Sequence, residues 1–201
     1  MSSQPYDIIL LPDPDLAAKA IRTSSELAPM GTDYTLSPTQ YLPHVSIYMV
    51  QLQDEDLEEV IARLATIATA TPALQLEGDK YVQSIGYIDV NYAKTQAVGN
   101  LQLTVVNAIN PLRDGLRPGK IEDLTAATGL AKENMEKYGE HRIGELFRPH
   151  LTFTRFTNRQ AIPVEDMGAP TAFNGTYRKL ALCELGPHGT CKRLVKEFPL
   201  A

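Results

Sequence analysis

The chain has 201 residues, a formal net charge of −5 and 21% charged side chains. This length suits one compact domain, and the negative charge argues against a broad basic surface for duplex DNA. No apolar run reaches the roughly 18 residues needed to cross a bilayer, and no signal-peptide core is recognisable. We therefore expect one domain over residues 1–201, monomeric and cytoplasmic, with no membrane or duplex-DNA partner.

The first part of the chain alternates strand and helix signals. Asp13 and Pro14 are typical of a helix start, because an aspartate caps the free N–H groups and proline fits the first turn. Residues 54–56, all acidic, are expected to cap a second helix. The predicted elements are a central strand over 6–11, a helix over about 16–27, a strand over about 44–52 and a helix over about 57–67.

The remainder continues the alternation, with one irregular stretch at 112–142 that we interpret as a lid or flap. Cys183 and Cys191 flank the last turn; a disulfide is geometrically conceivable, but two reduced, buried thiols fit a cytoplasmic chain better. The predicted elements are strands within 73–91 that turn near residues 78–80, a helix over about 93–110, short helices at 124–128 and 130–138, a strand over about 150–156, and a hairpin of 173–185 with 190–198.

One short pattern occurs twice, at 43–47 and at 149–153: proline, histidine, an aliphatic residue, a hydroxyl residue and another large apolar residue. In an extended strand, side chains two positions apart share a face. His44, Ser46 and Tyr48 would therefore project together, opposite a buried apolar face. The pattern predicts a histidine and a hydroxyl side by side on a strand.

The second copy places His150, Thr152 and Thr154 on one face in the same way. A bare His-x-Ser/Thr triplet is weak evidence, and His188 begins a third one that lies at a turn. Two half-buried strands with solvated histidines would explain one copy. The repetition of all five positions favours a functional pair, since two imidazoles can share acid–base chemistry on a phosphodiester.

The duplicated motif resembles those of the two-histidine (2H) phosphoesterase superfamily, which includes 2′-5′ RNA ligase-like and cyclic phosphodiesterase proteins. The resemblance rests on the two motifs, their wide separation, the chain length and the segment 185–190 before an apolar strand. It implies an α+β, bilobal fold: two pseudo-symmetric strand–helix halves with largely antiparallel sheets around a central cleft. It also implies metal-independent work, without cofactors, on 2′,3′-cyclic or 2′-5′-linked phosphates of nucleotides or RNA termini.

In this interpretation His44 and His150 are the catalytic acid and base, in an order that the sequence leaves open. A neutral and a protonated imidazole can coexist near pH 6.5, which predicts a bell-shaped rate profile. Ser46 and Thr152 would bind the phosphate through hydrogen bonds that strengthen in the transition state. We found no spacing of His, Cys, Asp and Glu that predicts a metal site.

Further substrate-binding candidates are Tyr48, Arg148 and Thr154. Tyr48 could stack on a nucleobase, although an ordinary strand aromatic explains it equally well. Arg148 lies two residues before the second histidine, whereas the other clustered cations are interpreted as solvated loop residues, at Arg113, Arg117 and Lys120 and at Arg142 and Arg155. His141 and His188 are interpreted as a surface-loop and a turn residue that could border the cleft.

Two rival functions remain open at this stage. The first is 2′-5′ RNA ligation, the reverse direction of related chemistry. The second is a binding protein that holds an RNA end or a nucleotide without turnover, or a scaffold of similar fold. The presence of both histidines weighs against the binding protein, because binding alone does not require two proton-transfer groups.

Overall fold

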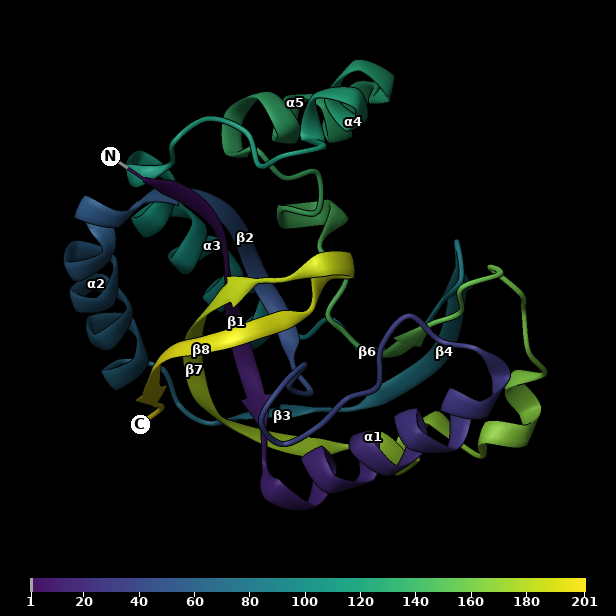
Figure 1. Cartoon of the computed structure of the whole chain (residues 1–201). Coiled ribbons are helices and arrows are strands. Elements are labelled where there is room, and N and C mark those ends of the chain that lie inside the picture. The colour runs from purple at the N-terminus through teal and green to yellow at the C-terminus, as the bar shows by residue number, and fades with distance from the viewer. Residues whose placement is uncertain (1) are drawn as a thin grey trace.

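The computed structural model describes residues 2–201 as two antiparallel sheets with helices packed around them (Figure 1). The larger sheet has the order β2-β1-β7-β3, and β8 also pairs with β7. Its strands are β1 (Ser3–Pro12), β2 (Val45–Gln53), β3 (Leu74–Leu76), β7 (Gly175–Leu185) and β8 (Cys191–Pro199). The apolar segment predicted as central is indeed central, since β1 lies between β2 and β7.

The smaller sheet has three strands in the order β4-β5-β6, within the described residues. They are β4 (Gly78–Ser84), β5 (Tyr87–Tyr92) and β6 (His150–Arg155). The two motif strands are therefore edge strands of different sheets: β2 is at the edge of the larger sheet and β6 at the edge of the smaller one. These two edges are in contact, which brings the two halves of the duplicated pattern together.

Helices cover both sheets. In Figure 1, α2 and α3 lie beside the larger sheet, α1 runs past the smaller one, and α4 and α5 form a separate layer at one end. The helices in residues 2–201 are α1 (Pro14–Leu27), α2 (Leu57–Thr69), α3 (Gln96–Ile109), α4 (Lys120–Ala126) and α5 (Gly129–Tyr138). Short 3-10 turns occupy Ala28–Met30, Asp54–Asp56, Asn110–Leu112, Gly144–Leu146, Val164–Met167, Pro170–Phe173 and Pro187–Gly189.

The start of α1 follows the predicted chemistry. Asp13 is its N-cap, and its Oδ1 accepts a hydrogen bond from the Leu16 N–H at 2.9 Å. The start of α2 does not: residues 54–56 form a 3-10 turn, and no side chain caps the helix. The expected capping role of these three acids is therefore wrong, because the turn places Asp56 in a helical conformation instead of the extended one that a cap requires.

The hairpin turn expected near residues 78–80 lies elsewhere. Ile85 and Gly86 form it, with φ angles of 54° and 88°. An isoleucine rarely adopts positive φ, so the sequence gives little sign of this turn. Gly78 has another task, because a Cβ atom there would come within 2.1 Å of the Pro170 carbonyl oxygen. The glycine lets β4 approach the backbone of the segment before β7.

The interior of the molecule joins the two sheets. One large apolar cluster contains residues from both, and the buried hydroxyls of Tyr177 on β7 and Tyr92 on β5 are 2.9 Å apart. A smaller cluster on the other face of the larger sheet contains Cys183 and Cys191, which are free and buried as the sequence interpretation favoured. Within residues 2–201 no helix has the length and apolar character needed to cross a membrane.

Candidate active site

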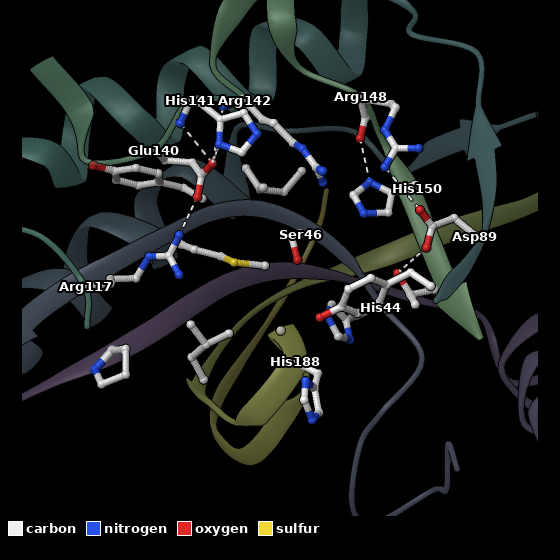
Figure 2. A pocket seen from close by; sticks show the side chains of 18 of the residues that line it. His44, Ser46, Asp89, Arg117, Glu140, His141, Arg142, Arg148, His150 and His188 are labelled. Atoms are coloured by element: carbon white, nitrogen blue, oxygen red, sulfur yellow. Dashed lines mark hydrogen bonds and ion pairs between the residues drawn. The ribbon is translucent and has the colours of Figure 1, made fainter. Parts of the chain in front are cut away.

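A pocket of about 470 Å³ lies where the two motif strands meet. All four histidines of the chain line it: His44, His141, His150 and His188. Figure 2 shows His44 and His150 entering the same space from opposite sides, with Ser46 between them. The two copies of the sequence pattern therefore converge on one cavity, although 101 residues separate them in the chain.

His44 precedes β2 and is fixed by its own backbone. Its Nδ1 lies 2.7 Å from the Leu42 carbonyl oxygen. A carbonyl oxygen only accepts, so Nδ1 carries the hydrogen, and the Nε2 of the neutral ring is left as a proton acceptor. Its imidazole side chain is 12% exposed. The proline before it holds the preceding backbone extended, which favours this local contact.

His150 repeats this arrangement at the start of β6. Its Nδ1 lies 2.7 Å from the carbonyl oxygen of Arg148, again two residues earlier. The same tautomer follows, with Nε2 free to accept a proton. Both catalytic candidates are thus presented to the pocket through the same ring nitrogen, held by the same type of contact.

Each motif hydroxyl donates a hydrogen bond to an aspartate on the neighbouring strand. Ser46 Oγ donates to Oδ2 of Asp7 on β1 at 2.6 Å. Thr152 Oγ1 donates to Oδ1 of Asp89 on β5 at 2.7 Å. The two halves therefore share a three-residue unit of histidine, hydroxyl and aspartate, which extends the duplication found in the sequence to a third residue.

The two aspartates differ in what neutralises them. Asp89 is paired with Arg148, whose Nη2 lies 3.1 Å from Oδ2, while Arg148 Nη1 donates to Asn91 at 2.8 Å. Asp7 is fully buried, and the Nε2 atom of His44 lies 3.8 Å from its Oδ2. Its Oδ1 has no hydrogen-bond partner within residues 2–201. Burial raises the pKa of Asp7 from 3.8 to about 7, against the hydrogen bond from Ser46.

This pKa bears on the phosphate-binding role expected for Ser46. The hydroxyl has a single hydrogen, and an ionised Asp7 keeps it. A protonated Asp7 can instead donate its own proton to Ser46 Oγ, which frees the Ser46 hydrogen for a ligand. Near neutral pH both states of Asp7 are accessible.

Burial also lowers the pKa of both motif imidazoles. For His44 the backbone contacts with Leu42 and Gly189 oppose this effect. For His150 the charge of Asp89 opposes it, whereas the guanidinium groups of Arg148 and Arg142 add to it. At a given pH, each of these two rings is therefore neutral in a larger fraction of molecules than the ring of an exposed histidine would be.

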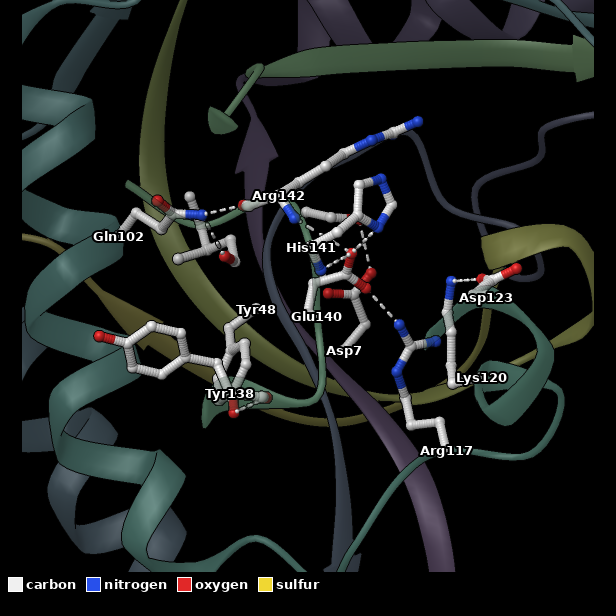
Figure 3. A network of polar contacts seen from close by, with 12 residues as sticks. Asp7, Tyr48, Gln102, Arg117, Lys120, Asp123, Tyr138, Glu140, His141 and Arg142 are labelled. Atoms are coloured by element: carbon white, nitrogen blue, oxygen red, sulfur yellow. Dashed lines mark hydrogen bonds and ion pairs between the residues drawn. The ribbon is translucent and has the colours of Figure 1, made fainter. Parts of the chain in front are cut away.

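One wall of the pocket comes from the irregular stretch that the sequence suggested as a lid. Figure 3 shows Glu140 at its centre, in an ion pair with Arg117 and 2.8 Å from His141 Nδ1. Burial alone would raise the pKa of Glu140, but the His141 hydrogen bond and the Arg117 charge lower it to about 2. The ionised carboxylate thus ties the segment before α4 to the segment after α5.

Most sequence-predicted site residues reach the pocket: His44, Ser46, Tyr48, Arg148, His150 and Thr152 all line it. Two of the substrate-binding predictions are nevertheless wrong. Tyr48 is 1% exposed and its hydroxyl lies 2.7 Å from the Tyr138 carbonyl, so its ring has no free face for a base. Thr154 is fully buried and donates to the Tyr34 carbonyl at 2.5 Å, because the chain before β2 covers this end of β6.

The structure adds residues that the sequence interpretation missed. Asp7 and Asp89 had a faint signal, since each is a lone acid within a strand of buried residues. Of the cations interpreted as solvated loop residues, Arg117, Lys120 and Arg142 line the pocket, whereas Arg113 and Arg155 do not. His141 and His188 border the cleft, the alternative considered for them.

No family model and no curated protein matches the sequence. Solved structures do match over the whole chain. E. coli LigT complexed with phosphate is similar with a TM-score of 0.61 at 11% identity, covering 100% of this chain and 99% of that one. A structure described as a phosphoesterase gives 0.63 at 11% identity with the same coverage, and TT0787 of Thermus thermophilus gives 0.61 at 16%, covering 98% of each chain.

The protein thus has an α+β fold of antiparallel sheets whose two edge strands bring paired histidines to one pocket. In particular, its fold is that of E. coli LigT. This confirms the fold class that the resemblance of the two motifs implied.

Proposed function

We propose that this chain is a two-histidine phosphoesterase that hydrolyses 2′,3′-cyclic or 2′-5′-linked phosphodiesters of nucleotides or RNA ends. The observation that carries the proposal is the matched pair of histidine, hydroxyl and aspartate units around one pocket. Each presents an imidazole Nε2 to the cavity. The likeness to E. coli LigT, which was crystallised with phosphate and with 3′-AMP, supports a nucleoside phosphate as the ligand.

In the proposed reaction one imidazole takes a proton from water as the oxygen attacks phosphorus. The other, protonated, gives its proton to the departing ribose oxygen on the opposite side. Neutral Nε2 is an acceptor and protonated Nε2 is a donor, so the same ring geometry serves both roles. Ser46, when Asp7 is protonated, and Thr152, if it turns from Asp89, would donate to the nonbridging oxygens as negative charge builds up.

A panel of substrates tests this proposal. 2′,3′-cyclic mononucleotides, a 2′-5′-linked dinucleotide and an RNA with a 2′,3′-cyclic end are incubated with the protein, and products are separated by chromatography. We expect hydrolysis of at least one of them, with a bell-shaped pH dependence of kcat/KM. Because burial lowers the pKa of both histidines, its maximum should lie below pH 6.5. Joining of RNA ends in the same assay would instead indicate a ligase, and binding without product a nucleotide-binding protein.

Activity on the best substrate is expected to survive saturating EDTA. Within residues 2–201 no three His, Cys, Asp or Glu side chains gather in a group that could hold a metal ion, and the proposed proton transfers need only the imidazoles. Activity is measured before and after chelation, and again after adding Mg²⁺, Mn²⁺ or Zn²⁺. Loss on chelation with recovery by one of these metals would contradict the mechanism.

Ser46→Ala and Thr152→Ala are each expected to lower kcat/KM by roughly 10–10³-fold, through loss of a transition-state hydrogen bond. Thr154→Ser is the matched control, because it keeps a hydroxyl on the same strand at a position outside the pocket. Steady-state kinetics with thermal unfolding as a check would measure both effects. Wild-type rates in both alanine variants would remove the hydroxyls from the mechanism.

A further inference from the structure

The cations around the pocket differ in whether a carboxylate neutralises them. Three of them are committed to acidic partners within the protein: Arg117 to Glu140, Lys120 to Asp123 and Arg148 to Asp89. Arg142 is different. Among residues 2–201 its guanidinium has no ion-pair partner within 4.0 Å and makes no hydrogen bond, and its side chain is exposed.

The position of Arg142 is nevertheless fixed by its backbone. Its carbonyl accepts a hydrogen bond from Gln102 Nε2 on α3 at 2.8 Å, and its N–H donates to Glu140 Oε1 at 3.3 Å. Glu140 is in turn held by Arg117. The segment that carries Arg142 is therefore anchored on both sides, while only the side chain remains uncommitted.

The uncommitted guanidinium extends into the pocket beside His141, towards His150 (Figure 2). It is close enough for its charge to lower the pKa of the His150 imidazole. It also lies near the like charge of Arg148, and desolvation by the pocket walls together with this neighbour lowers the pKa of Arg142 itself. The two carboxylates that act on Arg142 are those of Asp89 and Glu140, and each forms its ion pair with another arginine, Arg148 and Arg117 respectively. The positive charge of Arg142 is therefore left without a paired carboxylate, and an anion in the pocket would supply one.

The two motif hydroxyls, Ser46 and Thr152, offer no hydrogen to such an anion in this structure. The single hydrogen of each is directed at an aspartate. An arriving phosphate needs N–H or O–H donors, and a guanidinium offers two in the planar geometry that matches two phosphate oxygens. Arg142 is the pocket cation whose donors are all available.

We propose that Arg142 is the residue that binds the nonbridging oxygens of the reacting phosphate group, positioning it beside His150. This inference rests on the proposed function and identifies the ligand chemistry as a phosphate mono- or diester carried on a small molecule or chain end. Because Arg142 touches the reacting group but transfers no proton, its loss should affect both binding and the charge that develops in the transition state.

Arg142→Met and Arg142→Lys test the proposal. Methionine removes charge and donors, and lysine keeps the charge but loses the paired geometry. Inorganic phosphate is titrated into each protein by calorimetry. We expect roughly 10–100-fold weaker phosphate binding in the methionine variant, the size of one lost charge-assisted contact, and an intermediate loss in the lysine variant.

Arg22→Met is the matched control. Arg22 is an arginine on α1 outside the pocket, so this variant has the same net charge as Arg142→Met. It should bind phosphate like the wild-type protein. Equal phosphate affinity in Arg142→Met and wild type would overturn the inference, as would an equal loss in the Arg22 control.

The outcome does not depend on turnover. A wild-type protein that hydrolyses none of the cyclic or 2′-5′-linked substrates would contradict the proposed function. A phosphate affinity that depends on Arg142 would then still support the inference that Arg142 binds phosphate. Conversely, activity that depends on the two motif histidines but is unchanged in Arg142→Met would support the proposed function and contradict the role of Arg142 in binding phosphate. Thermal unfolding of each variant confirms that the fold is retained.

Discussion

His44→Ala and His150→Ala are each expected to lower kcat by roughly 10²–10⁴-fold, because each removes one of two proton-transfer groups. In the proposed mechanism the two residues act in one reaction, so the double variant should be little worse than the less active single variant. Both side chains line the pocket and are not part of the large apolar cluster, and we expect the fold to survive. Single-turnover and steady-state kinetics on the best substrate measure the loss.

The other two pocket histidines provide matched controls. Nδ1 of His141 is 2.8 Å from Glu140, and Nε2 of His188 is 3.6 Å from Asp33. Thr190, two residues after His188, donates its hydroxyl hydrogen to the Pro187 carbonyl and not to an aspartate, so His188 lacks the unit of histidine, hydroxyl and aspartate that the two motifs share. His188→Ala and His141→Ala should therefore cost less than either motif variant. Near-wild-type activity of His44→Ala or His150→Ala would refute the two-histidine mechanism.

Asp7→Asn is expected to stabilise the protein at alkaline pH. The folded state holds the Asp7 proton with a pKa of about 7, against 3.8 as the ordinary value. Unfolding therefore releases this proton between those values, and the free energy of unfolding falls as pH rises from about 4 to about 7, then stays level. Ionising the buried Asp7 therefore lowers the free energy of unfolding above pH 7 by about 4 kcal/mol, and a neutral asparagine avoids this loss.

Urea unfolding at pH 5 and pH 8.5 would measure the effect. The stability gain of Asp7→Asn should be larger at pH 8.5 than at pH 5, after allowing for the buried amide that the change introduces. Asp89→Asn is the control, and it should lower the free energy of unfolding instead of raising it, because it leaves Arg148 without its carboxylate. The same pH dependence in wild type and Asp7→Asn would show that Asp7 titrates like an exposed acid.

The repeated pattern made the centre of the site predictable. Its alternation placed His44 with Ser46 and His150 with Thr152, and a strand's period of two is a local property that needs no tertiary information. The capped start of α1 and the final hairpin were local in the same sense. These features follow from neighbouring residues, and the structure has them as expected.

The aspartates and the free arginine could not be predicted in this way. Whether Asp7 reaches Ser46 depends on strand register, and β1 and β2 shift register between Ile8 and Ile9. Ile9 lies opposite Ser46, so the contact with Asp7 is diagonal across an irregularity that no local pattern encodes. Tyr48 failed as a base-stacking residue for a similar reason, since α5 ends over its hydroxyl.

The buried hydroxyl contact between Tyr92 and Tyr177 bears on the relative position of His44 and His150. His44 immediately precedes β2 of the larger sheet, His150 begins β6 of the smaller one, and the tyrosine contact joins the two sheets through β5 and β7. The alignment of the two imidazoles is therefore set by how the sheets are docked, and not by any single loop. If the proposed mechanism holds, a substitution in the interior between the sheets would change the distance between the two imidazoles, and with it the rate, without altering any residue that lines the pocket.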